Sequence, residues 1–274
     1  MVMKACPAKT IKSRLIEEVG MEDPFTRLSV ATGLSGSGQT RRVPFFYRAL
    51  MASLPPVVRS FTNVKYVGLH RLPSNGPVIL AGNHTSHVDP IVVIMGARKP
   101  VRYLAKAEHF TGGLTKLVML STGQIETNRN AGGTQALSLA VDVLTDGGWM
   151  GIFPEGTRSR RASPPFLQKG KTGIARLAAK FPHAQIVPVC IKGARDFMKP
   201  GKSKISLFSP IVVEFGVPIT FRDWMLSPEG YNLSEEGISS MFPSEPGEFQ
   251  EMMGDIYRKF TDQLMGTLED MGAP

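Results

Sequence analysis

Residues 77–95 read PVILAGNHTSHVDPIVVIM, two apolar runs separated by a short polar turn. The first run, Val78–Ala81, is short and wholly apolar, which predicts a buried strand. The second run follows Asp89 and Pro90. It predicts a helix over about 90–97, because Asp is a preferred N-cap and Pro suits the first helical turn. A strand that leads directly into a helix is typical of α/β folds.

The same alternation continues along the chain. Helical spacing of apolar residues predicts helices over about 132–145 and 170–181. Strands alternating with helices predict an α/β fold with a mixed or largely parallel central sheet flanked by helices. The further apolar runs that predict strands are Val101–Leu104, Trp149–Phe153, Ile186–Ile191, Ile205–Leu207 and Ile211–Phe215.

Composition divides the chain into four regions. Residues 1–40 are expected to be partly disordered, since 33–38 read GLSGSG, a linker-like composition. Residues 41–62 mix aromatic residues with arginines and predict a helix that starts near Pro44 and ends at the proline pair 55–56; it either lies on anionic lipid or packs on the core. Residues 63–222 form the main α/β domain. Residues 223–274 are an acidic extension whose amphipathic helix, Phe249–Met271, is expected to dock on the core.

Charge is distributed unevenly over the 274 residues. Up to Arg222 there are 30 basic and 12 acidic residues, whereas from Asp223 onward there are 2 basic and 11 acidic residues. A basic body predicts an anionic partner such as a phosphorylated substrate or a phospholipid surface. Nucleic acid is not expected, because no array of stacking aromatics or reading helix accompanies the charge.

The location predicted from composition is cytoplasmic, on a membrane surface. The sequence contains no run of 18 apolar residues, so a transmembrane helix is not expected. The two cysteines, Cys6 and Cys190, are far apart in sequence, so a disulfide framework is not indicated and a reducing compartment is the simpler interpretation.

His84 and Asp89 carry the chemistry of the polar turn. In a turn they can meet, and a carboxylate on one ring nitrogen would fix the tautomer of a neutral imidazole acting as general base. Asp89 also fits a helix cap, with one carboxylate oxygen capping and the other holding the imidazole. A third interpretation makes His84, His87 and Asp89 metal ligands.

A second motif follows the strand predicted near 149–153. Residues 151–161 read GIFPEGTRSRR, an apolar run that ends in Pro, Glu and Gly before a cluster of arginines. Glycine lets a ligand approach the backbone, and arginine makes bidentate contacts to phosphate oxygens. Considered alone, this segment also fits an ordinary solvated basic loop.

Together the two motifs resemble those of the glycerolipid acyltransferase family. The resemblance rests on NHTS followed by Asp89 and, about 70 residues later, on FPEGTRS at 153–159. Weaker matches are YLAKAE at 103–108, GQIETNR at 123–129 and IVPV at 186–189. Within GQIETNR, Glu126 and Thr127 stand where the family usually has apolar residues.

The resemblance implies that the protein moves a fatty acyl group from acyl-CoA or an acyl-carrier protein to a glycerophosphate hydroxyl. The acceptor that the resemblance favours is 1-acylglycerol-3-phosphate, whose acylation would give phosphatidic acid. His84 would be the base and Asp89 its orienting partner, with no metal or other cofactor. The implied substrate-binding residues are Lys106, Arg129, Glu155, Gly156, Thr157, Arg158 and Arg160, with Glu155 orienting an arginine or binding a glycerol hydroxyl.

Three other functions remain open on the sequence. Glycerol-3-phosphate or another lysophospholipid is an alternative acceptor. A metal-dependent hydrolase would use His84, His87 and Asp89. A non-catalytic protein would bind anionic lipid through the basic body.

Overall fold

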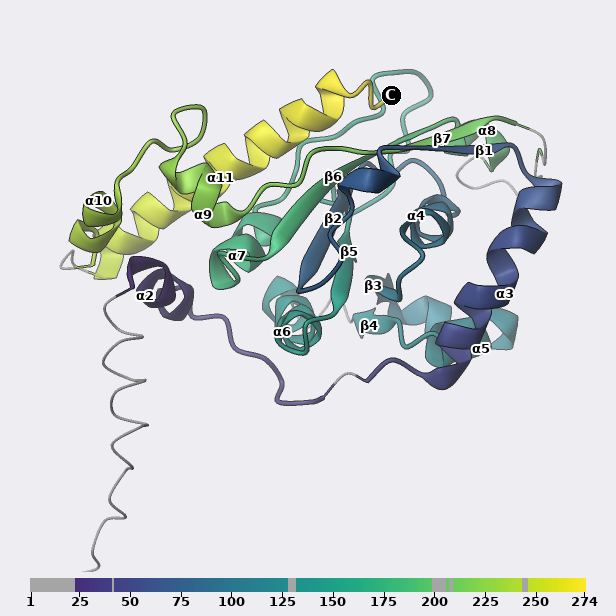
Figure 1. The fold of residues 1–274 in the computed structure, drawn as a ribbon, viewed down its shortest axis with the longest axis horizontal. Coiled ribbons are helices and arrows are strands. Elements are labelled where there is room, and N and C mark those ends of the chain that lie inside the picture. The colour runs from purple at the N-terminus through teal and green to yellow at the C-terminus, as the bar shows by residue number, and fades with distance from the viewer. Residues whose placement is uncertain (1–22, 41, 128–131, 199–205, 207–208, 243–245) are drawn as a thin grey trace, which may run out of the picture.

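A seven-stranded sheet runs through the middle of the molecule, shown by a computed structural model that describes residues 23–40, 42–127, 132–198, 206, 209–242 and 246–274 (Figure 1). The strand order is β1-β7-β6-β2-β5-β3-β4. All neighbours are parallel except β6 and β7, which are antiparallel. The predicted α/β class with a largely parallel sheet is therefore confirmed. The strands are β1 (Val64–Val67), β2 (Val78–Gly82), β3 (Val101–Lys106), β4 (Ile125–Thr127), β5 (Trp149–Ile152), β6 (Gln185–Lys192) and β7 (Ile211–Phe215).

Helices cover both faces of this sheet (Figure 1). One face carries α2 (Pro24–Ala31), α6 (Gly132–Thr145), α7 (Gly173–Lys180), α9 (Phe221–Leu226), α10 (Glu235–Ser240) and α11 (Pro246–Asp270). The other carries α4 (Asp89–Ala97) and α8 (Ala194–Phe197), with α3 (Phe45–Phe61) and α5 (Gly113–Ser121) near α4. Two short 3₁₀ turns, η1 (Leu69–Arg71) and η2 (Ala107–Phe110), complete the described elements.

Two apolar cores, one on each face, follow from the composition of the central strands. Every residue of β2 and β5 is buried, as expected for parallel strands covered on both sides. Side chains of β2 alternate between the cores: Ile79 and Ala81 join α6 and α7, whereas Val78 and Leu80 pack with α4. The sheet is thus held rigidly at the strands that carry the two sequence motifs.

The C-terminal helix α11 docks on the core, as its amphipathic pattern predicted. Ile256, Phe260 and Leu264 are buried in the same cluster as α7. Within the described part of the chain, no helix combines the length and the apolar character needed to cross a bilayer.

Helix α3 continues through the proline pair that was expected to end it. Pro55 and Pro56 lie inside the helix, which extends to Phe61. The fixed φ of proline is itself helical, so the main costs are ring crowding and the loss of two amide donors. Much of this helix is exposed, and water can bind the carbonyls left without donors.

Several elements differ from the sequence expectations in extent or presence. Helix α2 was not predicted, although Asp23 caps it by accepting the N–H of Thr26 at 2.8 Å. Strands β1 and β4 have only four and three residues and were missed. The predicted strand Ile205–Leu207 lies largely outside the described residues.

Candidate active site

The two sequence motifs leave the sheet side by side. Strands β2 and β5 are parallel neighbours in which Ala81 pairs with Ile152. Their carboxyl ends therefore lie at the same edge, where β2 leads into residues 83–88 and β5 leads into residues 153–161. This is the edge at which open α/β sheets bind ligands.

His84 and Asp89 meet as the sequence predicted. His84 Nδ1 lies 2.9 Å from Asp89 Oδ2, and the Asp89 side chain is fully buried. The same oxygen accepts the backbone N–H groups of Thr85 and Ser86, each at 2.7 Å. Because Oδ2 already accepts two backbone N–H groups, we assign the proton between Asp89 and His84 to Nδ1. Nε2 is then the imidazole nitrogen that can accept a proton.

The expectation that Asp89 also caps α4 is wrong. The cap position of α4 is Val88, and no side chain caps the helix. Asp89 Oδ2 is directed back to the polar turn, and Asp89 Oδ1 has no hydrogen-bond partner among the described residues. The Asp89 carboxylate orders the turn that precedes α4. Its role is to hold residues 83–88, which we call the histidine loop.

The second motif hydrogen-bonds both backbone polar groups of His84. Glu155 Oε1 accepts the His84 N–H at 2.6 Å, and the Ser159 N–H donates to the His84 carbonyl at 3.1 Å. The other Glu155 oxygen accepts the backbone N–H and the side-chain amide of Gln168, at 3.1 and 3.2 Å. Glu155 thus connects three segments of the site.

This geometry corrects the expected role of Glu155. Its side chain is only 3% exposed, and its oxygens bind His84 and Gln168 rather than an arginine. Burial raises the pKa of its carboxyl to about 7, opposed by the hydrogen bonds from His84 and Gln168. Glu155 therefore positions the histidine loop, and both of its oxygens already accept hydrogen bonds there.

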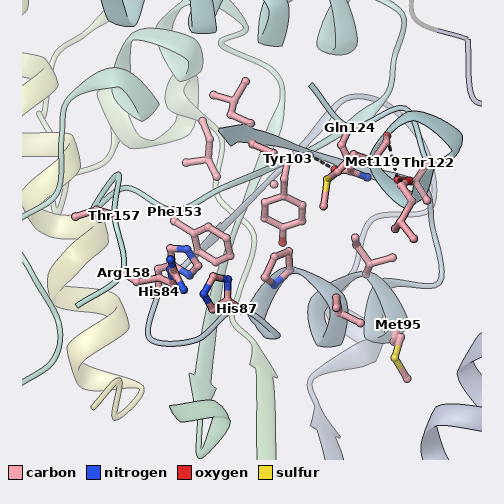
Figure 2. Close-up of a pocket in the computed structure, with 18 of the residues that line it drawn as sticks. His84, His87, Met95, Tyr103, Met119, Thr122, Gln124, Phe153, Thr157 and Arg158 are labelled. Carbon is pink, nitrogen blue, oxygen red and sulfur yellow. Dashed lines mark hydrogen bonds between the residues drawn. The ribbon is translucent and has the colours of Figure 1, made fainter. Parts of the chain in front are cut away.

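The imidazole of His84 is also fixed by stacking. Its ring lies 4.0 Å from the ring of Phe153, with 7° between the planes, and Phe153 in turn stacks on Tyr103 at 5.2 Å. Figure 2 shows these rings along one side of a pocket, with Arg158 beside His84. The sequence contained Phe153 within its motif but gave no sign that it would orient the base.

Asn83 is a second residue whose role the sequence did not reveal. Its amide donates to the carbonyl of Ile191 at 2.9 Å and accepts the Ile191 N–H at 2.7 Å. This pair of bonds ties the end of β2 to β6 directly beneath the histidine loop. The loop is therefore anchored to β6 on one side and to the loop after β5 on the other.

His84 opens onto a cavity of about 1270 Å³. The volume exceeds the roughly 300–1,000 Å³ of ordinary small-molecule pockets. Helices α3, α4 and α5 supply most of its apolar wall, and the loop after β5 supplies polar groups near His84. The apolar lining from these helices comprises Leu50, Met51, Leu54, Ile91, Ile94, Met95, Val118 and Met119.

Arginines gather at the His84 end of this cavity. Arg158 and Arg160 line it, together with Gly156, Thr157 and Arg195. Gly156 has φ +69°, a conformation that favours glycine. The pKa of Arg158 is lowered overall, because burial lowers it by more than the nearby Asp89 charge raises it. Arg158 Nη1 is buried and has no hydrogen-bond partner among the described residues.

The structure describes the side chain of neither Lys106 nor Arg129, two residues expected to bind the substrate. Lys106 ends β3 at the same edge of the sheet, but its side chain lies outside what the structure describes. Arg129 lies outside the described residues altogether.

The metal-ligand interpretation gains no support from the described residues. They contain no group of three His, Cys, Asp or Glu side chains arranged to hold a metal ion. His87 lines the cavity, whereas Asp89 is directed to His84 and the turn amides.

Comparison with known proteins agrees with this geometry. Residues 63–192 match the family model described as Acyltransferase. The match covers a little less than half of the chain. The matched segment spans β1 to β6 and therefore contains both motifs and the His84–Asp89 pair.

Individual relatives that are similar to this chain carry acyltransferase names. A 1-acyl-sn-glycerol-3-phosphate acyltransferase of Borreliella burgdorferi is 30% identical over 132 residues, covering 47% of this chain and 51% of the relative. An enzyme of that name from Bacillus subtilis is 25% identical over 169 residues, covering 60% of this chain and 82% of the relative. The chain spans about half the length of the first two curated relatives that it matches.

A solved structure shares the fold of this chain. The 1-acyl-sn-glycerophosphate acyltransferase PlsC of Thermotoga maritima matches with a TM-score of 0.52 and 19% identity, covering 80% of this chain and 81% of that one. At this identity the likeness concerns the fold alone.

Proposed function

We propose that the chain transfers a fatty acyl group from a thioester donor, acyl-CoA or an acyl-carrier protein, to the free hydroxyl of 1-acylglycerol-3-phosphate. The observation that carries this proposal is the His84–Asp89 pair at the arginine-lined end of a large apolar cavity. The cavity suits an acyl chain, and the arginines suit a phosphate. The names of the relatives support the same acceptor.

The reaction needs one proton acceptor and one nucleophile. His84 Nε2 takes the proton of the acceptor hydroxyl as its oxygen attacks the thioester carbonyl. The tetrahedral intermediate collapses, the C–S bond breaks, and the proton on His84 passes to the departing sulfur. Asp89 holds the Nδ1 proton throughout and stabilises the transient imidazolium. General-base catalysis of this kind contributes on the order of 10²–10⁴ in rate.

Placement of the acceptor supplies a further part of the rate. Arg158 and Arg160 line the same end of the cavity as His84 and would hold a phosphate there by charge-assisted hydrogen bonds. Holding the hydroxyl near Nε2 makes the attack effectively intramolecular. Phe153 and Glu155 keep the ring and backbone of His84 in place, so the base need not reorganise.

Helix α3 is proposed to rest on an anionic membrane surface. Phe45 and Phe46 are 85% and 54% exposed, whereas Tyr47 is buried and donates its hydroxyl to the Val101 carbonyl at 2.8 Å. Leu117 and Leu120 of α5 are exposed as well, and both helices line the cavity. A membrane at this face would bring lipid substrates beside the apolar wall.

One assay tests the substrate assignment. The purified chain is offered 1-acylglycerol-3-phosphate or glycerol-3-phosphate, each with acyl-CoA or acyl-carrier protein as donor. Phosphatidic acid formed from 1-acylglycerol-3-phosphate supports the proposal. Transfer only to glycerol-3-phosphate would correct the acceptor, and the absence of transfer with every combination would refute the proposed function.

A further inference from the structure

Arg195 lies beside the candidate active site without belonging to either sequence motif. It follows β6 in the short helix α8, after Gly193, whose φ is +78°. A Cβ at Gly193 would lie 2.0 Å from the Pro210 carbonyl oxygen, so this turn needs glycine. Because β6 is the other neighbour of β2, Arg195 and the loop after β5 approach His84 from opposite sides.

The loop after β5, residues 156–168, crosses the end of β2 to reach Arg195. We call this segment the arginine loop. Its Ser159 N–H binds the His84 carbonyl, and Arg195 Nη1 donates to the Ser159 carbonyl at 3.1 Å. Arg195 Nη2 donates to the Arg161 carbonyl at 2.5 Å. The guanidinium therefore holds the backbone on both sides of Arg160.

Arg195 also contacts the returning half of the arginine loop. Its guanidinium carbon lies 4.2 Å from the centre of the Phe166 ring, a cation–π contact. The backbone N–H groups of Phe166 and Leu167 donate to the Pro274 carbonyl at 3.0 and 2.8 Å. Arg195 thus joins the outgoing half of the loop to a returning half that is itself anchored.

Such a tether matters because the arginine loop belongs to no helix or strand. No ladder of backbone bonds fixes its path, so its order depends on individual contacts of this kind. A planar guanidinium can donate to two carbonyls and stack on a ring at the same time, whereas a lysine ammonium lacks this fixed fork.

We infer that Arg195 is a positioning residue that holds the arginine loop in the conformation needed to bind the acceptor phosphate. The inference rests on the proposed function for the identity of the ligand, and on Ser159, Arg161 and Phe166 for the tether. Loss of Arg195 should loosen Arg158 and Arg160 together. It should therefore weaken acceptor binding more than donor binding.

The test combines amide hydrogen exchange of residues 156–168 with steady-state kinetics of Arg195→Ala and Arg195→Lys. Arg71→Ala is the matched control, because Arg71 also donates to a backbone carbonyl, that of Phe215 at 3.1 Å, away from the cavity. Both Arg195 variants should exchange faster in this segment than wild type and Arg71→Ala. The acceptor KM should rise about ten-fold or more and the donor KM by less than about two-fold.

The Arg195→Lys variant distinguishes a positioning role of Arg195 from a role that needs only its positive charge. If Arg195→Lys restores the wild-type acceptor KM, Arg195 acts as a positive charge and the inference is wrong. Unchanged exchange of residues 156–168 in Arg195→Ala, or an equal rise in both KM values, would also overturn it. If the wild-type chain acylates no acceptor, the proposed function fails separately, and the exchange data still decide whether Arg195 tethers the loop.

Discussion

Glu155 accepts the backbone N–H of His84 in a 2.6 Å hydrogen bond that joins residues 71 positions apart. The bond places a buried carboxyl group directly behind the proposed base. Its other oxygen holds Gln168, so the histidine loop and the arginine loop are ordered by one side chain. The two motifs are therefore parts of one hydrogen-bonded unit.

The raised pKa of Glu155 predicts a pH dependence of stability. Since its carboxyl has a pKa of about 7 when folded and about 4.5 otherwise, the folded state binds this proton more tightly. The stabilisation is fully present below about pH 4.5 and is lost as pH rises to about 7. Relative to Glu155→Gln, the wild-type free energy of unfolding should fall over that interval by on the order of 3 kcal/mol.

Urea unfolding at a series of pH values between 4.5 and 8 measures this difference. Glu229→Gln, which changes an exposed glutamate, is the control and should show no comparable trend. A difference between wild type and Glu155→Gln that stays constant with pH would contradict the assignment.

Asp89→Asn tests the orienting carboxylate. An asparagine oxygen can still accept the N–H groups of Thr85 and Ser86, but it lacks the charge that stabilises the imidazolium of His84. We expect kcat to fall by on the order of 10²–10⁴, with substrate KM values little changed. Circular dichroism should show a folded variant. A folded Asp89→Asn protein with wild-type kcat would rule out this role.

Arg158→Ala tests phosphate binding. Because its proposed partner is the acceptor phosphate, the acceptor KM should rise about ten-fold or more while the donor KM changes by less than about two-fold. Lys169→Ala removes an exposed positive charge just beyond the arginine loop and serves as the control. Equal effects on both KM values would undo the assignment.

The exposed aromatic residues of α3 predict membrane binding. Replacing both Phe45 and Phe46 with serine should reduce flotation with anionic liposomes, because it removes two exposed aromatic side chains from that helix. Val30→Ser is the control, since Val30 is 71% exposed on the opposite face of the sheet. Unchanged flotation of the double variant would show that α3 is not the docking surface.

Sequence patterns predicted the elements whose signal is local. The central strands β2, β5 and β6 are continuous apolar runs because both faces are covered, and α6, α7 and α11 show helical spacing. The short strands β1 and β4 carry too few residues for a period to emerge. Helix α3 continues through Pro55 and Pro56, and much of the helix is exposed to water. The presence of prolines in the sequence does not reveal this exposure.

The residues of the candidate site form the same two groups, those with a local sequence signal and those that depend on contacts between distant segments. Residues His84, Asp89, Arg158 and Arg160 were recognisable because their types and spacing form motifs. The contacts of Glu155, Phe153 and Arg195 join segments distant in sequence, and only the parallel pairing of β2 with β5 and β6 brings those segments together. The family resemblance suggested that Glu155 orients an arginine or binds a glycerol hydroxyl, whereas its buried contacts make it a positioning group.

The most direct test of the account is the turnover of His84→Ala with 1-acylglycerol-3-phosphate and the best thioester donor. His70→Ala, a change of an exposed histidine on η1, is the matched control. The account predicts that kcat of His84→Ala falls at least about 10²-fold in a protein with wild-type circular dichroism, whereas His70→Ala stays within about two-fold of wild type. Near wild-type turnover by folded His84→Ala would contradict it.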